Sequence, residues 1–306
     1  MDGVLIADKP EGMSSAHLVA RVKRWSGCRK IGHAGTLDPF ATGVMILLLN
    51  RATKLAGFFL NGKKTYRGTL RLGSETDTQD ATGTVTHERP VPGGLTAADI
   101  RQMMTGFIGE QEQRPPVFSA LKHHGVPLYK LARRGEPVQK PPRRIRIHAL
   151  ELETVALPDI TFEVQCSAGT YVRTLAADMG HALGCGGHLS ALRRLTSCGF
   201  DAQKALNLDE IRCLTEKNEL EMYLVSMADA LKAFPGVTAG GALTEKLKYG
   251  RILSISDLPE QSVAVLEQRG SNGILKVLNE KAELLAVLQL DIVGKMINYK
   301  ANFMIQ

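Results

Sequence analysis

The stretch "KIGHAGTLDPFATGVMILLL", residues 30–49, holds a loop that runs directly into a hydrophobic segment. Three glycines and one proline break regular structure in the loop, and Pro39 biases Asp38 toward an extended backbone. Residues 43–49 are short and apolar throughout, which predicts a strand buried on both faces. The stretch therefore places a carboxylate, Asp38, and an imidazole, His33, at the mouth of a core strand.

Strand and helix patterns are mixed on both sides of this stretch, so we expect a protein of both α and β structure. One clear boundary signal is Thr96, a predicted helix N-cap. Residues 233–243 carry clustered glycine and proline and form a candidate linker, with a small β-rich unit beyond it. The predicted strands are 3–10, 43–49, 64–73, 160–166 and a pair around the turn at 279–281; the predicted helices are 15–27, 52–60, 96–109 and 171–183.

Composition excludes several classes of protein. The chain has 306 residues, 44% hydrophobic and 23% charged, as in ordinary globular proteins. Its longest apolar run is about seven residues, far below the ~20 of a membrane helix, and no signal peptide is expected. The five cysteines form no CxxC pair, so we expect reduced thiols in a cytoplasmic protein, without a zinc site. With no P-loop, GxGxxG or metal cluster, neither a metal nor a cofactor is expected.

Positive charge is concentrated in one segment. The net charge is +7, yet residues 114–146 contain nine basic residues and only one acid, Glu136, so the remainder of the chain sums to −1. A charge run of this kind is usually a solvated face. Here, however, proline is abundant and Phe118 and Tyr129 lie between the charges, which favours a polyanion site where bases stack on rings. Nucleic acid is the leading partner, and an acidic protein surface is the alternative.

Arg173 is the second candidate for the site around Asp38. The segment "CSAGTYVRTL" predicts a strand, a glycine bend and then a helix whose first turn contains Arg173. A cation at a helix N-terminus is electrostatically unfavourable, so this arginine needs an anionic partner. We expect a bidentate pair with Asp38 that orients the carboxylate and keeps it ionised. An ionised, partly desolvated carboxylate is a competent nucleophile.

Several motifs, in family order, resemble those of the bacterial tRNA pseudouridine-55 synthases, the TruB family. "GHAGTLDPFATGV" closely resembles the active-site motif of the family. The resemblance runs from Gly3 to about Leu208. The other motifs are "GVLIADKPEGMSS", "KTYRGTLRLGSETDTQDATGTV", "QRPPVFSALKHHGVPLYKLARRG", "CSAGTYVRTLAADMG" and "HLSALRRL".

The resemblance implies a fold and a domain division. The fold is α+β: a large mixed, mainly antiparallel sheet flanked by helices, with a small β-rich PUA-like module at the C-terminus. It implies a catalytic domain over 1–235, with an RNA-gripping insertion at about 114–146, and an RNA-binding module over 236–306.

The resemblance also implies roles for individual residues. Asp38 is the catalytic nucleophile, Tyr66 stacks on the target uracil and helps to deprotonate C5, and Arg173 pairs with Asp38. The loop glycines are expected to let RNA approach closely. The implied base-binding and neighbouring residues are His33, Tyr171, Leu192 and Lys9, and the insertion contributes Lys130, Arg133, Arg134, Arg143 and Arg144 to RNA binding.

The function implied is conversion of uridine to pseudouridine at position 55 in the tRNA T loop, after extrusion of the base. We expect a monomer that acts on the T-arm without guide RNA, metal, cofactor or membrane. Whether Asp38 attacks C1′, assists formation of a glycal or attacks C6 stays open. Two alternatives are a binding-only tRNA chaperone and a relative that depends on a guide RNA.

Overall fold

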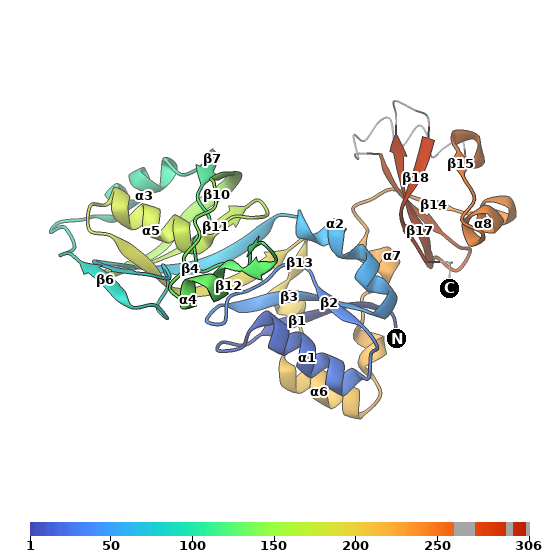
Figure 1. Cartoon of the computed structure of the whole chain (residues 1–306), viewed down its shortest axis with the longest axis horizontal. Helices are drawn as coiled ribbons and strands as arrows, with labels where there is room; N and C mark the ends of the chain where they lie inside the picture. Colours follow the sequence, from blue (N-terminus) through green and yellow to red (C-terminus); the bar gives the residue numbers. More distant parts are fainter. Residues whose placement is uncertain (260–272, 292–295, 304–306) are drawn as a thin grey trace.

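A mixed sheet forms the centre of the protein, for which the computed structural model describes residues 1–259, 273–291 and 296–303 (Figure 1). Within these residues the sheet has nine strands, and all pairings are antiparallel except that of β12 with β3. The expected mixed, mainly antiparallel sheet is therefore confirmed. In spatial order its strands are β1 (Gly3–Lys9), β3 (Thr42–Leu49), β12 (Gly187–Ser197), β4 (Lys64–Leu72), β11 (Asp159–Cys166), β10 (Arg143–Ala156) and β7 (Gly109–Gln113), while β2 (Ile31–His33) pairs with β3 and β13 (Phe200–Asp201) with β12.

Strand β3 is buried on both faces, as its uniformly apolar sequence predicts. Met45, Leu47 and Leu49 point into one hydrophobic cluster, whereas the alternate residues Val44 and Ile46 point into another. Side chains of a strand alternate between faces, so a strand with a core on each side needs apolar residues at every position. The firm position of β3 fixes the loop that precedes it.

Helices α1 and α6 cover one face of the β1–β3 end of the sheet (Figure 1). Helix α1 (Ser15–Ser26) begins at Ser14, whose side chain accepts from the His17 amide, and ends at Gly27 in the left-handed region. The predicted N-cap Thr96 is confirmed at α3 and closes a capping box with Asp99. The remaining helices of the first unit are α3 (Ala97–Thr105), α5 (Val172–Ala182), α6 (Leu208–Glu216) and α7 (Met227–Ala230).

The predicted helix over 52–60 is only partly correct. A 3-10 helix occupies Asn50–Leu55, and a single α-helical turn, α2 (Ala56–Leu60), follows it. Leu55 and Phe59 pack in the cluster on the face opposite α1. The helical pattern was read correctly, but the start and the tighter winding of the first turns were not.

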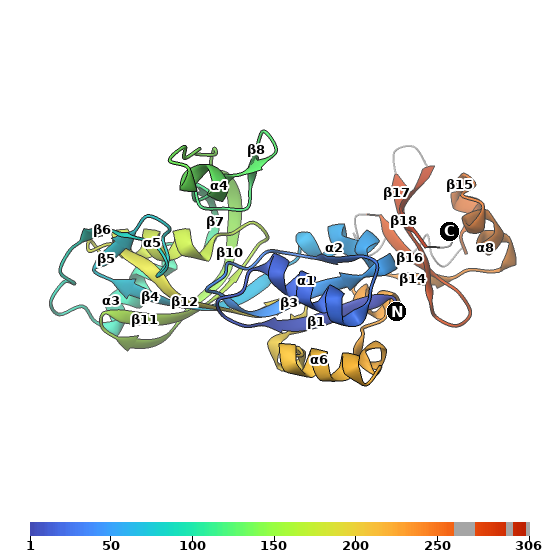
Figure 2. The same ribbon diagram turned by 60° about the horizontal axis from the view of Figure 1, so that its bottom comes forward.

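The basic insertion stands off the sheet as a small projection, which we call the thumb segment, residues 114–142 (Figure 2). It contains a short hairpin and a helix, and Leu128 is its buried anchor. Residues 143–146 belong instead to β10, which pairs with β7. The elements of the thumb segment are β8 (Lys122–His123), β9 (Val126–Pro127) and α4 (Leu128–Arg133); a separate hairpin near the sheet is formed by β5 (Ser74–Thr76) and β6 (Val85–Glu88).

A second, five-stranded sheet forms the C-terminal unit (Figure 1). The strand pair predicted around 279–281 is confirmed, and the candidate linker at 233–243 contains a strand of this sheet. Leu284, Val287 and Phe303 pack against the first unit, so the two units share a hydrophobic contact. The elements are β14 (Gly236–Thr238), α8 (Gly241–Lys248), β15 (Leu253–Ser254), β16 (Ile274–Leu278), β17 (Leu284–Asp291) and β18 (Met296–Asn302).

The helices in the described ranges are all too short or too polar to cross a membrane.

Candidate active site

The loop between β2 and β3 carries Asp38 to one edge of a cavity. The parallel pairing of β12 with β3 places Arg194 directly opposite Gly43. A Cβ at Gly43, which has φ of +105°, would overlap the Arg194 carbonyl oxygen and lie 2.7 Å from its nitrogen. Gly43 is therefore required by the close approach of β12, and the expectation that the loop glycines let RNA approach closely stays a prediction.

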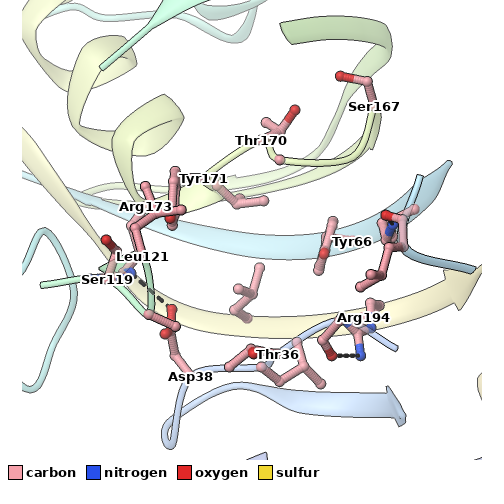
Figure 3. Close-up of a pocket in the computed structure, with 18 of the residues that line it drawn as sticks. Thr36, Asp38, Tyr66, Ser119, Leu121, Ser167, Thr170, Tyr171, Arg173 and Arg194 are labelled. Carbon is pink, nitrogen blue, oxygen red and sulfur yellow. Dashed lines mark hydrogen bonds and ion pairs between the residues drawn. The ribbon is translucent and has the colours of Figure 1, made fainter. Parts of the chain in front are cut away.

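Arg173 forms an ion pair with Asp38, with 2.9 Å between Nε and Oδ2 (Figure 3). The other two nitrogens are engaged elsewhere: Nη1 donates to the Thr78 carbonyl at 2.7 Å and Nη2 to the Phe118 carbonyl at 2.8 Å. The expected pairing of these two residues is present, but the expected bidentate geometry is not. Arg173 instead joins the Asp38 loop, the 77–84 loop and the thumb segment.

A second carboxylate, Asp80, lies 3.5 Å from Arg173 Nη1 through Oδ2. Its Oδ1 accepts from the hydroxyl of Thr78 at 2.8 Å and from the amide and hydroxyl of Thr82 at 2.9 and 2.6 Å. Asp80 is 4% exposed, and these donors satisfy its buried Oδ1. Sequence reasoning missed this residue; its signal was a hydroxyl two positions away on either side.

Burial raises the pKa of Asp38 above its ordinary value, and the nearby Asp80 carboxylate raises it further. The Arg173 guanidinium and the Lys9 ammonium act in the opposite direction without cancelling the effect of burial. The Asp38 side chain keeps 35% of its surface exposed, so it faces the cavity on one side and its partners on the other. A carboxylate in this setting is poorly solvated and correspondingly reactive.

Lys9 supports the loop from behind. Its side chain has no exposed surface, and Nζ donates to the carbonyls of Pro10 at 2.8 Å, Met13 at 2.7 Å and Pro39 at 3.2 Å. Pro39 follows Asp38 directly, so this lysine ties the reactive loop to the end of β1. Burial lowers the pKa of Lys9 to about 8.

The cavity beside Asp38 has a volume of about 360 Å³ (Figure 3). Tyr66 from β4 and Leu192 from β12 line it, together with Tyr171 from the turn before α5. Burial raises the pKa of Tyr66, against the effect of the Arg194 guanidinium. The predicted residues Asp38, Tyr66, Tyr171, Arg173 and Leu192 thus lie around one cavity.

Arg194 lines this cavity and is a second residue that sequence reasoning missed. It is 1% exposed, and its Nε donates to the Val44 carbonyl at 2.6 Å and its Nη2 to the Gly35 carbonyl at 3.2 Å. It therefore spans the start of the Asp38 loop and the strand after it. Adjacent arginines in "LRR" gave no sign of which one is buried.

A second cavity, of about 570 Å³, lies on the other side of Asp38. His33 lines it, as do Tyr129 and Arg133 from the thumb segment. Burial and the Arg194 charge both lower the pKa of His33, so the imidazole is neutral at pH 7. Two of the predicted RNA-binding residues border different cavities. Arg133 borders this second cavity, whereas Arg143 borders the first, with its Cζ 4.7 Å from the Tyr171 ring centroid.

The other three predicted RNA-binding residues, Lys130, Arg134 and Arg144, are exposed and line neither cavity. Within the described residues no three His, Cys, Asp or Glu side chains are grouped to hold a metal ion.

Comparison with known proteins gives the class and then the family. The fold superimposes on the solved "Cbf5-Nop10-Gar1 Complex" with a TM-score of 0.74 at 25% identity, covering 99% of this chain and 85% of that one. Residues 23–172 match the model of the "TruB family pseudouridylate synthase (N terminal domain)", and residues 173–232 match the "tRNA pseudouridylate synthase B C-terminal domain". The fold and the family models are those of a pseudouridylate synthase.

Two curated relatives are named tRNA pseudouridine synthase B. The one from Syntrophotalea carbinolica is 46% identical over 82% of this chain and 81% of its own length. The one from Opitutus terrae is 48% identical over 77% of this chain and 97% of its own length. The chain belongs to the TruB family of pseudouridylate synthases.

Proposed function

We propose that this protein converts uridine to pseudouridine at position 55 in the T loop of tRNA. The observation that carries the proposal is the Asp38–Arg173 ion pair at the edge of the cavity lined by Tyr66 and Leu192. The relatives are named as tRNA-modifying enzymes, which supports tRNA as the substrate. A site for binding alone has no need of a desolvated carboxylate held by a buried arginine.

The reaction needs the base outside the loop of the RNA. The extruded uracil enters the first cavity and stacks on Tyr66, with Leu192 and Tyr171 bounding it. Asp38 then acts on the ribose: as the N1–C1′ bond breaks, its electron pair leaves with N1, and the carboxylate compensates the positive charge that develops at C1′. Attack by the carboxylate on C1′ and formation of a glycal are both compatible with this position.

The net reaction is an isomerisation, so the remaining steps need no oxidant and no group from another molecule. The uracil turns and C5 bonds to C1′ as the Asp38–C1′ bond breaks or the glycal is reversed. The C5 proton leaves with the help of Tyr66 and N1 takes up a proton, so protons balance over the reaction. Arg194, beside the Tyr66 hydroxyl, favours the charged phenolate when that proton moves. Arg173 keeps the Asp38 carboxylate aimed at the sugar throughout.

The thumb segment and the adjoining start of β10 supply the contacts that position the RNA. Exposed Lys130, Arg134 and Arg144 bind phosphates, while Arg133 and Arg143 do so at the rims of the two cavities. His33, neutral and next to the second cavity, inserts into the T loop in place of the extruded bases. Lys9 acts only through the loop that it supports.

We further propose that the chain divides into a catalytic domain over 1–235 and an RNA-binding module over 236–306. The enzyme acts in the cytoplasm as a monomer, without guide RNA. The strands of the second sheet begin at Gly236, which supports this division.

The test is to incubate the purified protein with an unmodified T-arm stem-loop and no other RNA, and then to map pseudouridine. We expect product at position 55 alone, and none when that uridine is replaced by cytidine. Tight binding without product would favour a tRNA chaperone. Product that appears only after a guide RNA is added would favour a guide-dependent enzyme.

A further inference from the structure

Ser119, in the thumb segment, carries a buried hydroxyl that has no role in the reaction proposed above. The residue is 3% exposed, and its Oγ has no hydrogen-bond partner among the described residues. A buried hydroxyl left unpaired is costly, because it has given up its bonds to water without replacing them. In the described part of the chain, four other buried side-chain atoms without a hydrogen-bond partner belong to residues that line the two cavities, so the polar groups here are not all satisfied within the protein. The Ser119 hydroxyl therefore points to a partner that arrives with the substrate.

The backbone around Ser119 is held firmly, so the position of its side chain is defined. The Ser119 carbonyl accepts from the Tyr129 amide at 3.0 Å, and the preceding Phe118 carbonyl accepts from Arg173 Nη2 at 2.8 Å. The residue that orients Asp38 therefore also orients the chain next to Ser119.

Ser119 and Asp38 lie together at the junction of the two cavities, which we call the waist. Both residues line both cavities, and only a few others do so. In Figure 3, Ser119 lies beside Arg173 and Asp38, on the side of the site away from Tyr66 and Arg194. A substrate with its base in the first cavity and its neighbours in the second has its sugar at this waist.

We propose that the Ser119 hydroxyl forms a hydrogen bond with the ribose 2′-hydroxyl of the target uridine. The proposal rests on the proposed function, because it uses the placement of C1′ at Asp38. The 2′-hydroxyl is attached to the carbon next to C1′, so it comes to the same waist. Both hydroxyls donate and accept, so either direction of the bond satisfies the buried Ser119. The contact fixes the sugar against Asp38 and distinguishes RNA from DNA at this nucleotide.

A double-mutant cycle tests this contact. Single-turnover kcat/KM is measured for the wild type and Ser119→Ala, each with uridine, 2′-deoxyuridine or 2′-fluorouridine at the target position of a T-arm. We expect the Ser119→Ala change alone to lower kcat/KM about three- to tenfold, as the loss of one neutral hydrogen bond does. Removal of the 2′-hydroxyl should then lower the kcat/KM of Ser119→Ala less than that of the wild type. The two drops should differ by the same three- to tenfold factor. Effects of the substitution on sugar pucker or on the chemistry are common to both enzymes and cancel in the cycle.

The matched control is Thr170→Val, which removes a hydroxyl lining the same cavity at the end away from Asp38 (Figure 3). It should keep the full wild-type sensitivity to the 2′-hydroxyl, and Ser119→Thr should restore most of that sensitivity. If the deoxy substrate reacts too slowly, the same cycle is run on Kd in an Asp38→Asn background.

Thermal unfolding separates substrate contact from a structural role. Ser119→Ala removes no hydrogen bond of the free protein, so its Tm should equal or exceed that of the wild type. The proposal is overturned if Ser119→Ala retains the full wild-type sensitivity to the 2′-hydroxyl, whatever its Tm. A wild type that forms no pseudouridine would instead overturn the proposed function.

Discussion

Arg173 connects three segments that lie far apart in the sequence. One guanidinium contacts the Asp38 carboxylate, the Thr78 carbonyl and the Phe118 carbonyl, while Asp80 lies 3.5 Å away. Without the arginine, the half-buried Asp38 carboxylate and the buried Asp80 carboxylate would repel each other. The geometry of the reactive carboxylate therefore depends on a planar group with several donors.

We predict that Arg173→Lys severely reduces turnover. An ammonium on a shorter, non-planar side chain cannot reach Asp38 and both carbonyls at once. Single-turnover rates on a T-arm should fall at least about a hundredfold. The matched control is Arg193→Lys, which disturbs an arginine paired with Asp8 outside the two cavities and should leave the rate within a few-fold. Near-normal turnover of Arg173→Lys would show that Arg173 does not orient the Asp38 carboxylate.

The buried Lys9 gives a prediction about pH and stability. Its pKa in the folded protein is about 8, below the value of about 10.4 in an unfolded chain. Between these values the unfolded chain binds more protons, so the contribution of Lys9 to the free energy of unfolding rises with pH. We therefore expect the stability difference between wild type and Lys9→Met, measured by urea unfolding, to widen in favour of the wild type from pH 8 to about 10.

Lys9→Met also leaves the carbonyls of Pro10, Met13 and Pro39 without their donor, which destabilises the variant at every pH. That constant loss does not alter the slope of the difference with pH. Exposed Lys30→Met, as control, should show no comparable slope. A difference that is flat between pH 8 and 10 would show that Lys9 titrates as an ordinary lysine.

At the scale of the elements, the contact between β12 and β3 decides where the Asp38 loop lies. Gly43 and Arg194 face each other across the only parallel pairing of the described large sheet. Arg194 then bonds to the Gly35 and Val44 carbonyls on either side of the loop. The loop is thus held by a strand from the far half of the catalytic unit.

Gly43→Ala should destabilise the protein strongly. The new methyl group would overlap the backbone of Arg194, and φ at this position is +105°. Strain and overpacking each cost about 1–3 kcal/mol, so a loss of about 3 kcal/mol or more is expected in denaturant unfolding. Gly57→Ala, where nothing lies within 4 Å of the new Cβ, should be neutral or slightly stabilising. Equal stabilities of the two variants would contradict this account of the β12–β3 contact.

The thumb segment carries most of the net positive charge, which predicts a salt-dependent affinity. Neutralising four exposed cations to Gln should weaken T-arm binding and reduce the slope of log K against log salt by about 3. Turnover at saturating RNA should persist, because phosphate contacts position the substrate. The four residues are Lys130, Arg133 and Arg134 of the thumb segment and Arg144 at the adjoining start of β10.

The control for the thumb variant neutralises four exposed cations elsewhere and should change the slope much less. An unchanged slope in the thumb variant would show that the RNA lies on another surface. The four control residues are Arg101, Lys204, Lys217 and Lys232.

Local patterns were sufficient for elements whose signals lie within a few residues. The apolar run of β3, the Thr96 cap and the αL end of α1 at Gly27 could all be predicted. Asp80 and Arg194 could not, because their importance depends on neighbours about 90 and 150 residues away in the chain. The bidentate geometry failed for the same reason: the carbonyls that occupy Arg173 come from two other segments.

In the whole molecule, the large sheet holds the Asp38 carboxylate, and the positively charged thumb segment is the surface that we propose receives the RNA. The two cavities meet at Asp38, between the sheet and the thumb segment. The C-terminal unit packs on the sheet through Phe303, over whose ring Arg51 lies at 5.9 Å. We infer that the sheet and the thumb segment together serve one chemical group, the Asp38 carboxylate.

The most direct test compares wild type with Asp38→Asn on the same T-arm, measuring product and affinity together. The amide keeps the shape of the side chain but is not a nucleophile, and its loss of charge leaves the RNA contacts in place. We expect no pseudouridine from the variant, with Kd within about tenfold of the wild type, or roughly 1.4 kcal/mol. Substantial pseudouridine formation by an Asn variant verified by mass to be free of deamidation would contradict the account.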